Sequence, residues 1–553
     1  MTLLSRIIGW AFNLPPAETR DVVVERDLKV PMPDGAVLLA DHYYPRKNPR
    51  APTILIRSPY GRTGAWGIMF GRPFAERGFQ VILQSCRGTF GSTGDFRPFH
   101  NERADGLATL AWLKEQPWFS GELCTFGASY MGYVQWAVAA EAGPELKAMA
   151  LQVTGSEFRS SIYAGESFWL DTALTWLYMV AHQENSPIAA MLANLRSARV
   201  LKPILNQLPL RRLDEAAIGK PADFYRDWVD HNEPDDPFWK PLDFSERLGD
   251  ITAPAHLVAG FYDVFLPRTL ADYRRLREAG KHPYLTIGPW THMDTTWLKM
   301  SMSETIAWYR AHLFGDTSAL RKSPVQVFVM GAGEWREFDE WPPPGYQAQR
   351  WHLQPNHGLA AAPPISSEPD HYRYDPADPT PSVGGSSLSG NSGPKDNRAL
   401  EARKDVLVYT SAPLESDLEA IGPVTAELYV KSSLEHTDFF ARLCDVSSNG
   451  KSINVCDGLV RLTPKMAPPD EDGCRKVTLE LWATAYRFKR GHRVRLQVSS
   501  GSHPRFTRNT GSGEPLATAT RLVAADQTVF HDPSRPSAIV LPVRNSKEKR
   551  SVD

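Results

Sequence analysis

The spacing of apolar residues first predicts strands and then an alternation of strands and helices. Residues 20–45 alternate apolar and polar positions around an Asp34-Gly35 turn, so two antiparallel strands are expected there. Short apolar runs that predict buried strands follow at residues 51–61, 78–88, 122–129 and 146–153. Residues 101–116 and the segment that starts at Tyr130 have helical spacing. This order is typical of a parallel, doubly wound α/β sheet.

A helical region interrupts this alternation. Residues 157–239 show helical periodicity with no clear strand, which predicts an inserted helical subdomain. The strand pattern then resumes at residues 253–265, 282–292 and 323–331, the last of these being the final strand expected of the sheet. The helical patterns between them lie at residues 267–280 and 303–315.

Helical periodicity almost vanishes after the Pro-rich break at residues 340–347. The segments that follow alternate apolar and polar positions, and turn signals such as Asn449-Gly450 separate them. This pattern predicts an all-β domain, either a two-sheet sandwich or a jelly roll. The expected division is residues 1–150 and 246–342 for the α/β domain, 151–245 for the helical insertion and 343–553 for the β domain.

Composition and charge fit a soluble globular protein that acts on small molecules. The chain has 553 residues, 42% of them apolar and 23% charged, with a formal net charge of −1. This balance gives no overall excess of basic residues of the kind that binds nucleic acid. No uninterrupted apolar stretch is long enough to span a membrane, so no membrane partner is expected. A homodimer is left open.

The cysteine count argues against a disulfide framework. The five cysteines form no C-x-x-C pair, and no zinc or other metal site is expected from them. An acidic stretch near Asp235 lacks the spaced oxygen ligands of a calcium loop. The first 19 residues hold a short apolar run but no A-x-A-like cleavage site. A cytoplasmic protein without a cofactor is therefore expected.

Ser129 is the first candidate for chemistry, because it stands where a predicted strand turns into a helix. Gly127 precedes it by two residues and Gly132 follows it by three. A strand-to-helix turn of this kind can expose a nucleophilic serine, although the usual pattern is G-x-S-x-G and here Met131 holds the last glycine position. A turn that only needs small residues would look similar, so the motif alone decides nothing.

Asp263 and His292 support the interpretation of Ser129 as a nucleophile. Each follows one of the strands predicted after the helical insertion. The order Ser, Asp, His along the chain is the one that α/β hydrolases use. Histidine takes the proton of a serine nucleophile, and aspartate orients the imidazole. His282 is the rival base but precedes its strand, and Asp294 is the rival acid but lies too close to His292 in sequence.

An oxyanion hole needs two hydrogen-bond donors. The backbone N–H of Tyr130, the residue after the serine, is the first candidate. The loop after the strand at residues 51–61 has no run of glycines to offer a second backbone donor, but it contains Tyr60. The Tyr60 phenol is therefore the second candidate, unless it is only a packed loop aromatic.

Several stretches together make the sequence similar to the CocE/NonD hydrolases, the cocaine esterase and X-Pro dipeptidyl-peptidase superfamily. They are "IRSPYGR", "QSCRGTFGSTGDF", "TFGASYMGYVQW", "GFYDVFLP", "GPWTH", "YDPADPTPSVGG" and "GHRVRLQVSSGSHPRF". The resemblance spans nearly the whole chain, and the family's own elbow is G-x-S-Y-x-G. It implies an α/β hydrolase fold with an inserted helical cap and a C-terminal jelly roll. It also implies that Ser129, Asp263 and His292 form the triad, with Tyr60 and the Tyr130 N–H as the oxyanion hole.

The resemblance also suggests a substrate pocket where the three domains meet. Tyr163, Trp176 and Phe265 look like counterparts of the aromatic walls of cocaine-cleaving members, and Leu388 stands before Ser389 where those members have a bulky aromatic. Members that act on free amino groups need carboxylates near the site. Here only Glu166 and Asp171 of the cap are candidates for that role.

The function expected is hydrolysis of carboxylic esters through an acyl-enzyme intermediate, with a small-molecule ester or amide as substrate. An X-Pro dipeptidyl-peptidase or an amide acylase of the same superfamily is the nearest alternative. A non-catalytic binding protein on the same fold is the alternative from another class.

Overall fold

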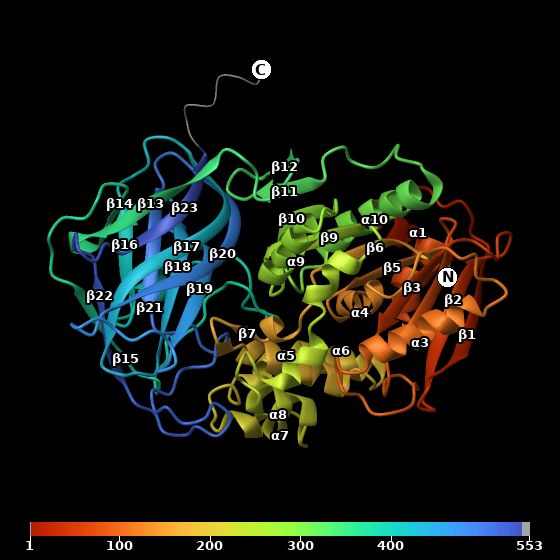
Figure 1. Cartoon of the computed structure of the whole chain (residues 1–553), viewed down its shortest axis with the longest axis horizontal. Helices are drawn as coiled ribbons and strands as arrows, with labels where there is room; N and C mark the ends of the chain where they lie inside the picture. Colours follow the sequence, from red (N-terminus) through yellow and green to blue (C-terminus); the bar gives the residue numbers. More distant parts are fainter. Residues whose placement is uncertain (1, 545–553) are drawn as a thin grey trace.

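The computed structural model describes residues 2–544 and has three parts (Figure 1). An α/β part holds a ten-stranded sheet in the order β1-β2-β4-β3-β5-β6-β9-β10-β11-β12, parallel from β4 to β11. Its strands are β1 (Val22–Pro31), β2 (Val37–Pro45), β3 (Thr53–Ser58), β4 (Gln80–Ser85), β5 (Leu123–Ala128), β6 (Leu146–Gln152), β9 (Ala255–Tyr262), β10 (Tyr284–Thr291), β11 (Val325–Val329) and β12 (Glu334–Phe338). The predicted antiparallel pair and parallel sheet are therefore both present.

Helices cover both faces of this sheet. They are α2 (Arg72–Ala75), α3 (Glu102–Lys114), α4 (Tyr130–Ala139), α9 (Leu266–Glu278) and α10 (Thr296–Phe314). Successive residues of a strand point to opposite faces, so Leu55 of β3 packs in the cluster with α3, α4 and α9. Its neighbours Ile54 and Ile56 pack in the cluster with α2 and α10. Because both faces are covered, the central strands β3, β4 and β5 are buried along their whole length.

The inserted region is mainly helical, as its periodicity predicts. Its helices are α5 (Leu170–His182), α6 (Pro187–Leu201), α7 (Leu213–Ile218) and α8 (Asp223–Asp230), with short 3-10 turns at Arg159–Ser161, Leu210–Arg212, Pro237–Leu242 and Ser245–Asp250. A two-stranded hairpin, β7 (Tyr163–Ala164) with β8 (Ser167–Phe168), also lies here. Strands of two residues are too short to produce the alternation that predicts a strand.

The C-terminal part is rich in strands, and hydrogen bonds link eleven of them. They are β13 (Tyr346–Gln354), β14 (Gly358–Ala360), β15 (Asp370–Tyr374), β16 (Leu407–Ser411), β17 (Leu418–Ser432), β18 (Thr437–Val446), β19 (Ser452–Leu462), β20 (Arg475–Phe488), β21 (Arg493–Ser499), β22 (Ala525–Phe530) and β23 (Ala538–Arg544). Buried and more exposed residues alternate along much of β17 and β20, so one face of each turns to the core. The helical elements described here are α11 (Arg398–Glu401) and a 3-10 turn at Pro355–His357.

Two elements differ from the expectation. The strand at residues 323–331 is not the last of the sheet, because β12 follows it and pairs with β11 in antiparallel fashion. The first residues form helix α1 (Thr2–Ala11), whereas the sequence suggested only a short apolar run. Among the described residues, no helix combines the length and the apolar character needed to cross a bilayer.

Candidate active site

Ser129 occupies a strained turn between β5 and α4. Its φ of 55° and ψ of −123° lie in a region that a residue with a side chain seldom adopts. The backbone around it is firmly held, because the Ser129 N–H donates to the carbonyl of Gln152 at 2.9 Å. Such strain persists only where the surroundings impose it, and it is common at functional sites.

The two flanking glycines are required by close packing. A Cβ on Gly127 would lie 2.4 Å from the Cβ of Met131, and a Cβ on Gly132 would lie 2.4 Å from Cγ2 of Thr154. The first contact is within the turn, whereas the second is with the segment after β6. The glycine three residues after Ser129 therefore has a packing reason of its own, which accounts for the displaced motif.

The loops after β9 and β10 bring Asp263 and His292 to the serine. Asp263 Oδ2 lies 2.6 Å from His292 Nδ1, and His292 Nε2 lies 3.1 Å from Ser129 Oγ. Asp263 is fully buried, and its Oδ1 accepts a hydrogen bond from the backbone N–H of Phe265 at 2.7 Å. A carboxylate, an imidazole and a hydroxyl in this order can remove the hydroxyl proton as the oxygen attacks a carbonyl.

The two rival residues lie elsewhere. His282 precedes β10, and its Nδ1 lies 3.2 Å from Nη1 of Arg277 at the opposite end of the strand. The Asp294 carboxylate accepts a hydrogen bond from the backbone N–H of Thr296 at the start of α10. The structure therefore brings together the residues that the sequence analysis preferred.

Tyr60 reaches the same site from the loop after β3, the strand next to β5. Its hydroxyl accepts a hydrogen bond from Nε1 of Trp176 in α5 at 3.0 Å, and its ring stacks on Trp66. Burial raises the pKa of Tyr60 to about 12, although hydrogen bonds with Trp176 and Ser129 act in the opposite direction. Because an indole can only donate, the phenol keeps its own proton for another acceptor.

Tyr130 is the first residue of α4, so its N–H has no acceptor within the helix. Its side chain fixes the position of this N–H. The Tyr130 hydroxyl donates to Oε1 of Glu102 at 2.6 Å and accepts from the N–H of Phe99 at 2.9 Å. Glu102 is itself paired with Arg57 at 2.8 Å. This buried support behind the turn has no sequence motif and was not predicted.

A small, mainly apolar pocket opens beside Ser129 and His292. Its volume is about 40 Å³, and three of the predicted wall residues, Trp176, Phe265 and Leu388, line it. The cap and the loop before α3 contribute further lining residues that the sequence analysis missed, namely Phe99, Phe158, Ile162 and Trp228. They lie far apart in the sequence, and their spacing carries no signal that they meet.

Tyr163, the fourth predicted wall residue, lies in the cap away from this pocket. Among the described residues, Tyr163 is not one of those that line the pocket. Its ring packs against Phe168 and Trp239, and its hydroxyl donates to the carbonyl of Trp228 at 2.7 Å. The short β7–β8 hairpin turns this side chain into the cap, where it supports the backbone of a lining residue instead.

The two cap acids do not face the pocket either. Asp171 is buried, and its Oδ2 accepts a hydrogen bond from the hydroxyl of Ser387 at 2.5 Å. Glu166 is exposed and pairs with Arg159 at 2.6 Å. No Asp or Glu is among the described residues that line the pocket.

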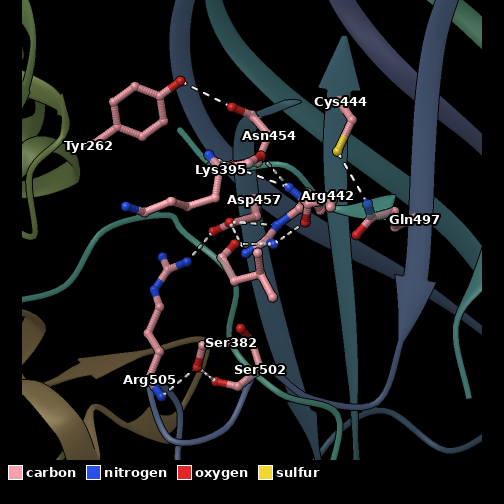
Figure 2. A network of polar contacts seen from close by, with 12 residues as sticks. Tyr262, Ser382, Lys395, Arg442, Cys444, Asn454, Asp457, Gln497, Ser502 and Arg505 are labelled. Atoms are coloured by element: carbon pink, nitrogen blue, oxygen red, sulfur yellow. Dashed lines mark hydrogen bonds and ion pairs between the residues drawn. The ribbon is translucent and has the colours of Figure 1, made fainter. Parts of the chain in front are cut away.

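A buried polar network holds the loop between β15 and β16, which carries Leu388, and Figure 2 shows Ser382 and Lys395 of this loop. Asp457 of β19 accepts hydrogen bonds from Arg442 at 2.9 Å and from Arg505 at 2.5 Å. The loop passes so close that a Cβ on Gly385 would lie 2.4 Å from Nη1 of Arg505. The ion cluster therefore fixes the backbone three residues before Leu388.

The same network reaches the segment that carries Asp263. Tyr262, its immediate neighbour, donates from its hydroxyl to the backbone carbonyl of Asn454 at 3.1 Å (Figure 2). The Asn454 side chain in turn accepts from the N–H of Lys395 at 2.7 Å. The C-terminal part thus holds both a pocket wall and the strand end that precedes the carboxylate.

Within residues 2–544, no cluster of three or more His, Cys, Asp or Glu side chains has the arrangement of a metal site.

Comparisons with known proteins agree with this architecture. Residues 34–294 match the model of the X-Pro dipeptidyl-peptidase (S15) family, and residues 318–540 match its C-terminal non-catalytic domain. The chain is 32% identical to a cocaine esterase of Rhodococcus sp. (strain MB1 Bresler), over 94% of this chain and 98% of that protein.

Solved structures show the same fold at lower identity. An α-amino acid ester hydrolase superposes with a TM-score of 0.80 at 20% identity, covering 96% of this chain and 98% of its own. A CocE/NonD family hydrolase from Staphylococcus aureus superposes with a TM-score of 0.71 at 17% identity, covering 94% of each chain. With the sequence match over nearly the whole length, these findings make the chain a member of the CocE/NonD family of serine hydrolases.

Proposed function

We propose that the protein hydrolyses carboxylic esters, with Ser129 as nucleophile, His292 as general base and Asp263 as the acid that orients it. The observation that carries this proposal is the continuous chain of hydrogen bonds from Asp263 through His292 to Ser129 Oγ. The position of Ser129 at a strained elbow supports the same assignment. The test is whether ester hydrolysis and covalent labelling are lost together when Ser129 is replaced.

The reaction has two halves that use the same groups. Ser129 Oγ attacks the ester carbonyl as its proton moves to Nε2 of His292, and the resulting oxyanion lies between the Tyr60 hydroxyl and the Tyr130 N–H. Collapse breaks the ester bond, and His292 returns the proton to the departing alcohol. Water then attacks the acyl-enzyme with His292 again as base, which releases the carboxylic acid and restores Ser129.

The pocket favours a compact, apolar acyl group. Its walls are aromatic and aliphatic side chains, among them Phe99, Phe158 and Trp228, and its volume is small. Apolar walls gain from burial of an apolar acyl group, whereas a charged amine buried without a partner costs free energy. Simple esters therefore fit the site better than dipeptides with a free N-terminus.

This difference gives a prediction on substrate class. The kcat/KM for a short acyl or aryl ester should exceed that for a dipeptidyl-prolyl anilide by at least about tenfold, the equivalent of roughly 1.4 kcal/mol. Steady-state kinetics on both substrate series makes the comparison. A dipeptidyl-prolyl anilide that is cleaved more efficiently than the esters would assign the protein to the X-Pro peptidases instead.

Tyr60→Phe should lower kcat by about 10²–10³-fold with little change in KM, because it removes one donor to the oxyanion. The phenyl ring still stacks on Trp66, so the melting temperature should stay close to that of the wild type. Steady-state kinetics of this variant decides the role of Tyr60. A kcat within about threefold of wild type would leave the phenol with a packing role only.

Trp176 should affect stabilisation of the oxyanion through its hydrogen bond to Tyr60. Trp176→Phe deletes the hydrogen bond to the phenol, so its loss in kcat should largely disappear when Tyr60→Phe is already present. Trp228→Phe is the matched control, since Trp228 lines the same pocket but its Nε1 has no partner among the described residues. Effects of Trp176→Phe and Tyr60→Phe that simply add would mean that Trp176 is only a pocket wall.

We also propose a division of the chain into domains and a cellular location. The division into residues 1–150 with 246–342, 151–245 and 343–553 follows the changes in element type, and we assign a jelly roll to the strand-rich last part. A cytoplasmic location is supported by five free, buried cysteines.

A further inference from the structure

A second cavity lies between the cap and the C-terminal part, separate from the pocket at Ser129. Its volume is about 730 Å³, and it shares no lining residue with that pocket. The cap contributes the turn between β7 and β8 and the segment around Leu208 and Leu210. The C-terminal part contributes the end of β19 and the loop at residues 507–519. The size is typical of sites that bind small organic molecules.

The charged side chains that line this cavity are paired, with one exception. Glu166 pairs with Arg159, Glu233 with Lys465, Arg461 with Asp438, and Glu514 with Arg521. Arg508 has no Asp or Glu partner among the described residues. The cavity wall therefore carries one positive charge that no side chain balances.

Arg508 is also nearly buried, with 9% of its surface exposed. Its Nη1 donates to the carbonyl of Pro376 at 3.0 Å and its Nη2 to the carbonyl of Asn206 at 2.5 Å, while Nε has no partner in residues 2–544. A guanidinium has more N–H groups than these two bonds use, and it does not lose its proton in proteins. Burial lowers the pKa of Arg508, as expected where a counterion is missing.

Most other buried arginines are paired with carboxylates, although, among the described residues, Arg77, like Arg508, donates only to backbone carbonyls, those of Pro15 and Pro73. Arg442 and Arg505 share Asp457, and Arg57 pairs with Glu102. A buried charge without a counterion costs free energy that a paired one does not. A bound anion would supply the missing partner, and the cavity beside Arg508 has room for it.

We propose that this cavity binds a carboxylic acid with an apolar body, the carboxylate facing Arg508. A monoanion matches the single unbalanced charge, whereas a phosphate dianion would leave an excess negative charge near Glu166, Glu233 and Glu514. The apolar body fits the rest of the wall, where Leu208, Leu210 and Leu516 lie beside prolines. This site is independent of the reaction proposed at Ser129.

The test is calorimetric titration of the full-length protein with 4-phenylbutyrate, its neutral amide and inorganic phosphate. The acid should bind saturably, and the amide and phosphate should each bind at least about tenfold more weakly. Arg508→Gln should weaken binding of the acid by at least about tenfold. The matched control is Arg373→Gln, an exposed arginine that pairs with Asp526 outside this cavity, which should bind the acid like wild type.

A crystal of the wild type soaked with 4-(4-bromophenyl)butyrate locates the ligand without any variant. The anomalous bromine peak should lie in the cavity beside Leu516, with the carboxylate at Arg508. This measurement also decides the matter if Arg508→Gln does not fold. Absence of saturable binding, equal affinity for the amide, unchanged affinity of folded Arg508→Gln, or a bromine peak only at the Ser129 pocket would each overturn the proposal.

Discussion

Replacing Ser129 with alanine is expected to lower kcat/KM for acyl esters by roughly 10⁴–10⁶-fold, because no other group forms the covalent intermediate. The fold should be unaffected. The Ser129 hydroxyl contacts His292, whereas the turn is held by backbone bonds that alanine keeps, including the bond from the Ser129 N–H to the carbonyl of Gln152. Activity on a chromogenic ester and the melting temperature are the two measurements.

Ser161→Ala provides the matched control for this variant. Ser161 lines the same pocket and is buried, but its hydroxyl has no hydrogen-bond partner among the described residues. Its replacement should change kcat/KM by less than about threefold, within the range of ordinary substitutions. If Ser161→Ala loses as much activity as Ser129→Ala, removal of any hydroxyl from the pocket is harmful and the assignment of Ser129 fails.

Asp263→Asn should lower kcat by about 10⁴-fold, the second largest effect expected. The carboxylate Oδ2 accepts the Nδ1 proton of His292, which leaves Nε2 free to accept the proton of Ser129. An asparagine amide can donate to Nδ1 and thereby favour the wrong tautomer. The bond from the Phe265 N–H to Oδ1 can be kept by the amide oxygen, so the loop should hold its shape.

The control for this variant is Asp294→Asn in the loop of His292. Among the described residues, the Asp294 carboxylate accepts a hydrogen bond from the backbone N–H of Thr296 alone, so the kcat of the variant should stay within about threefold of wild type. Steady-state kinetics of both variants at several pH values separates orientation of the imidazole by Asp263 from a general effect of negative charge near His292. Comparable losses in both would indicate a general effect of charge near His292 rather than a specific orientation of the imidazole.

The sequence predicts the strands around Ser129 because apolar runs and turn residues are local signals. Ser129, Asp263 and His292 each follow such a run, so their meeting at one edge of the sheet follows from parallel topology. Tyr60 could be predicted for the same reason, since its loop follows the strand that borders β5.

The pocket walls depend on contacts that no local pattern records. Tyr163 is an aromatic residue of the cap, as are Trp176 and Trp228, yet it turns into the cap interior and they turn toward Ser129. The direction depends on a hairpin of two-residue strands, which leaves no periodic signal. The unbalanced Arg508 is likewise invisible in a sequence whose total charge is close to neutral.

The most direct test of the proposed mechanism is covalent labelling with a fluorophosphonate, followed by peptide mapping of the folded protein. The account predicts one label per chain, at Ser129, with ester hydrolysis lost in proportion to labelling. Ser129→Ala should take up no label, and Asp263→Asn should react far more slowly because its His292 no longer activates the hydroxyl. A label on another residue that abolishes activity, or a fully active protein that takes up no label at all, would contradict the account.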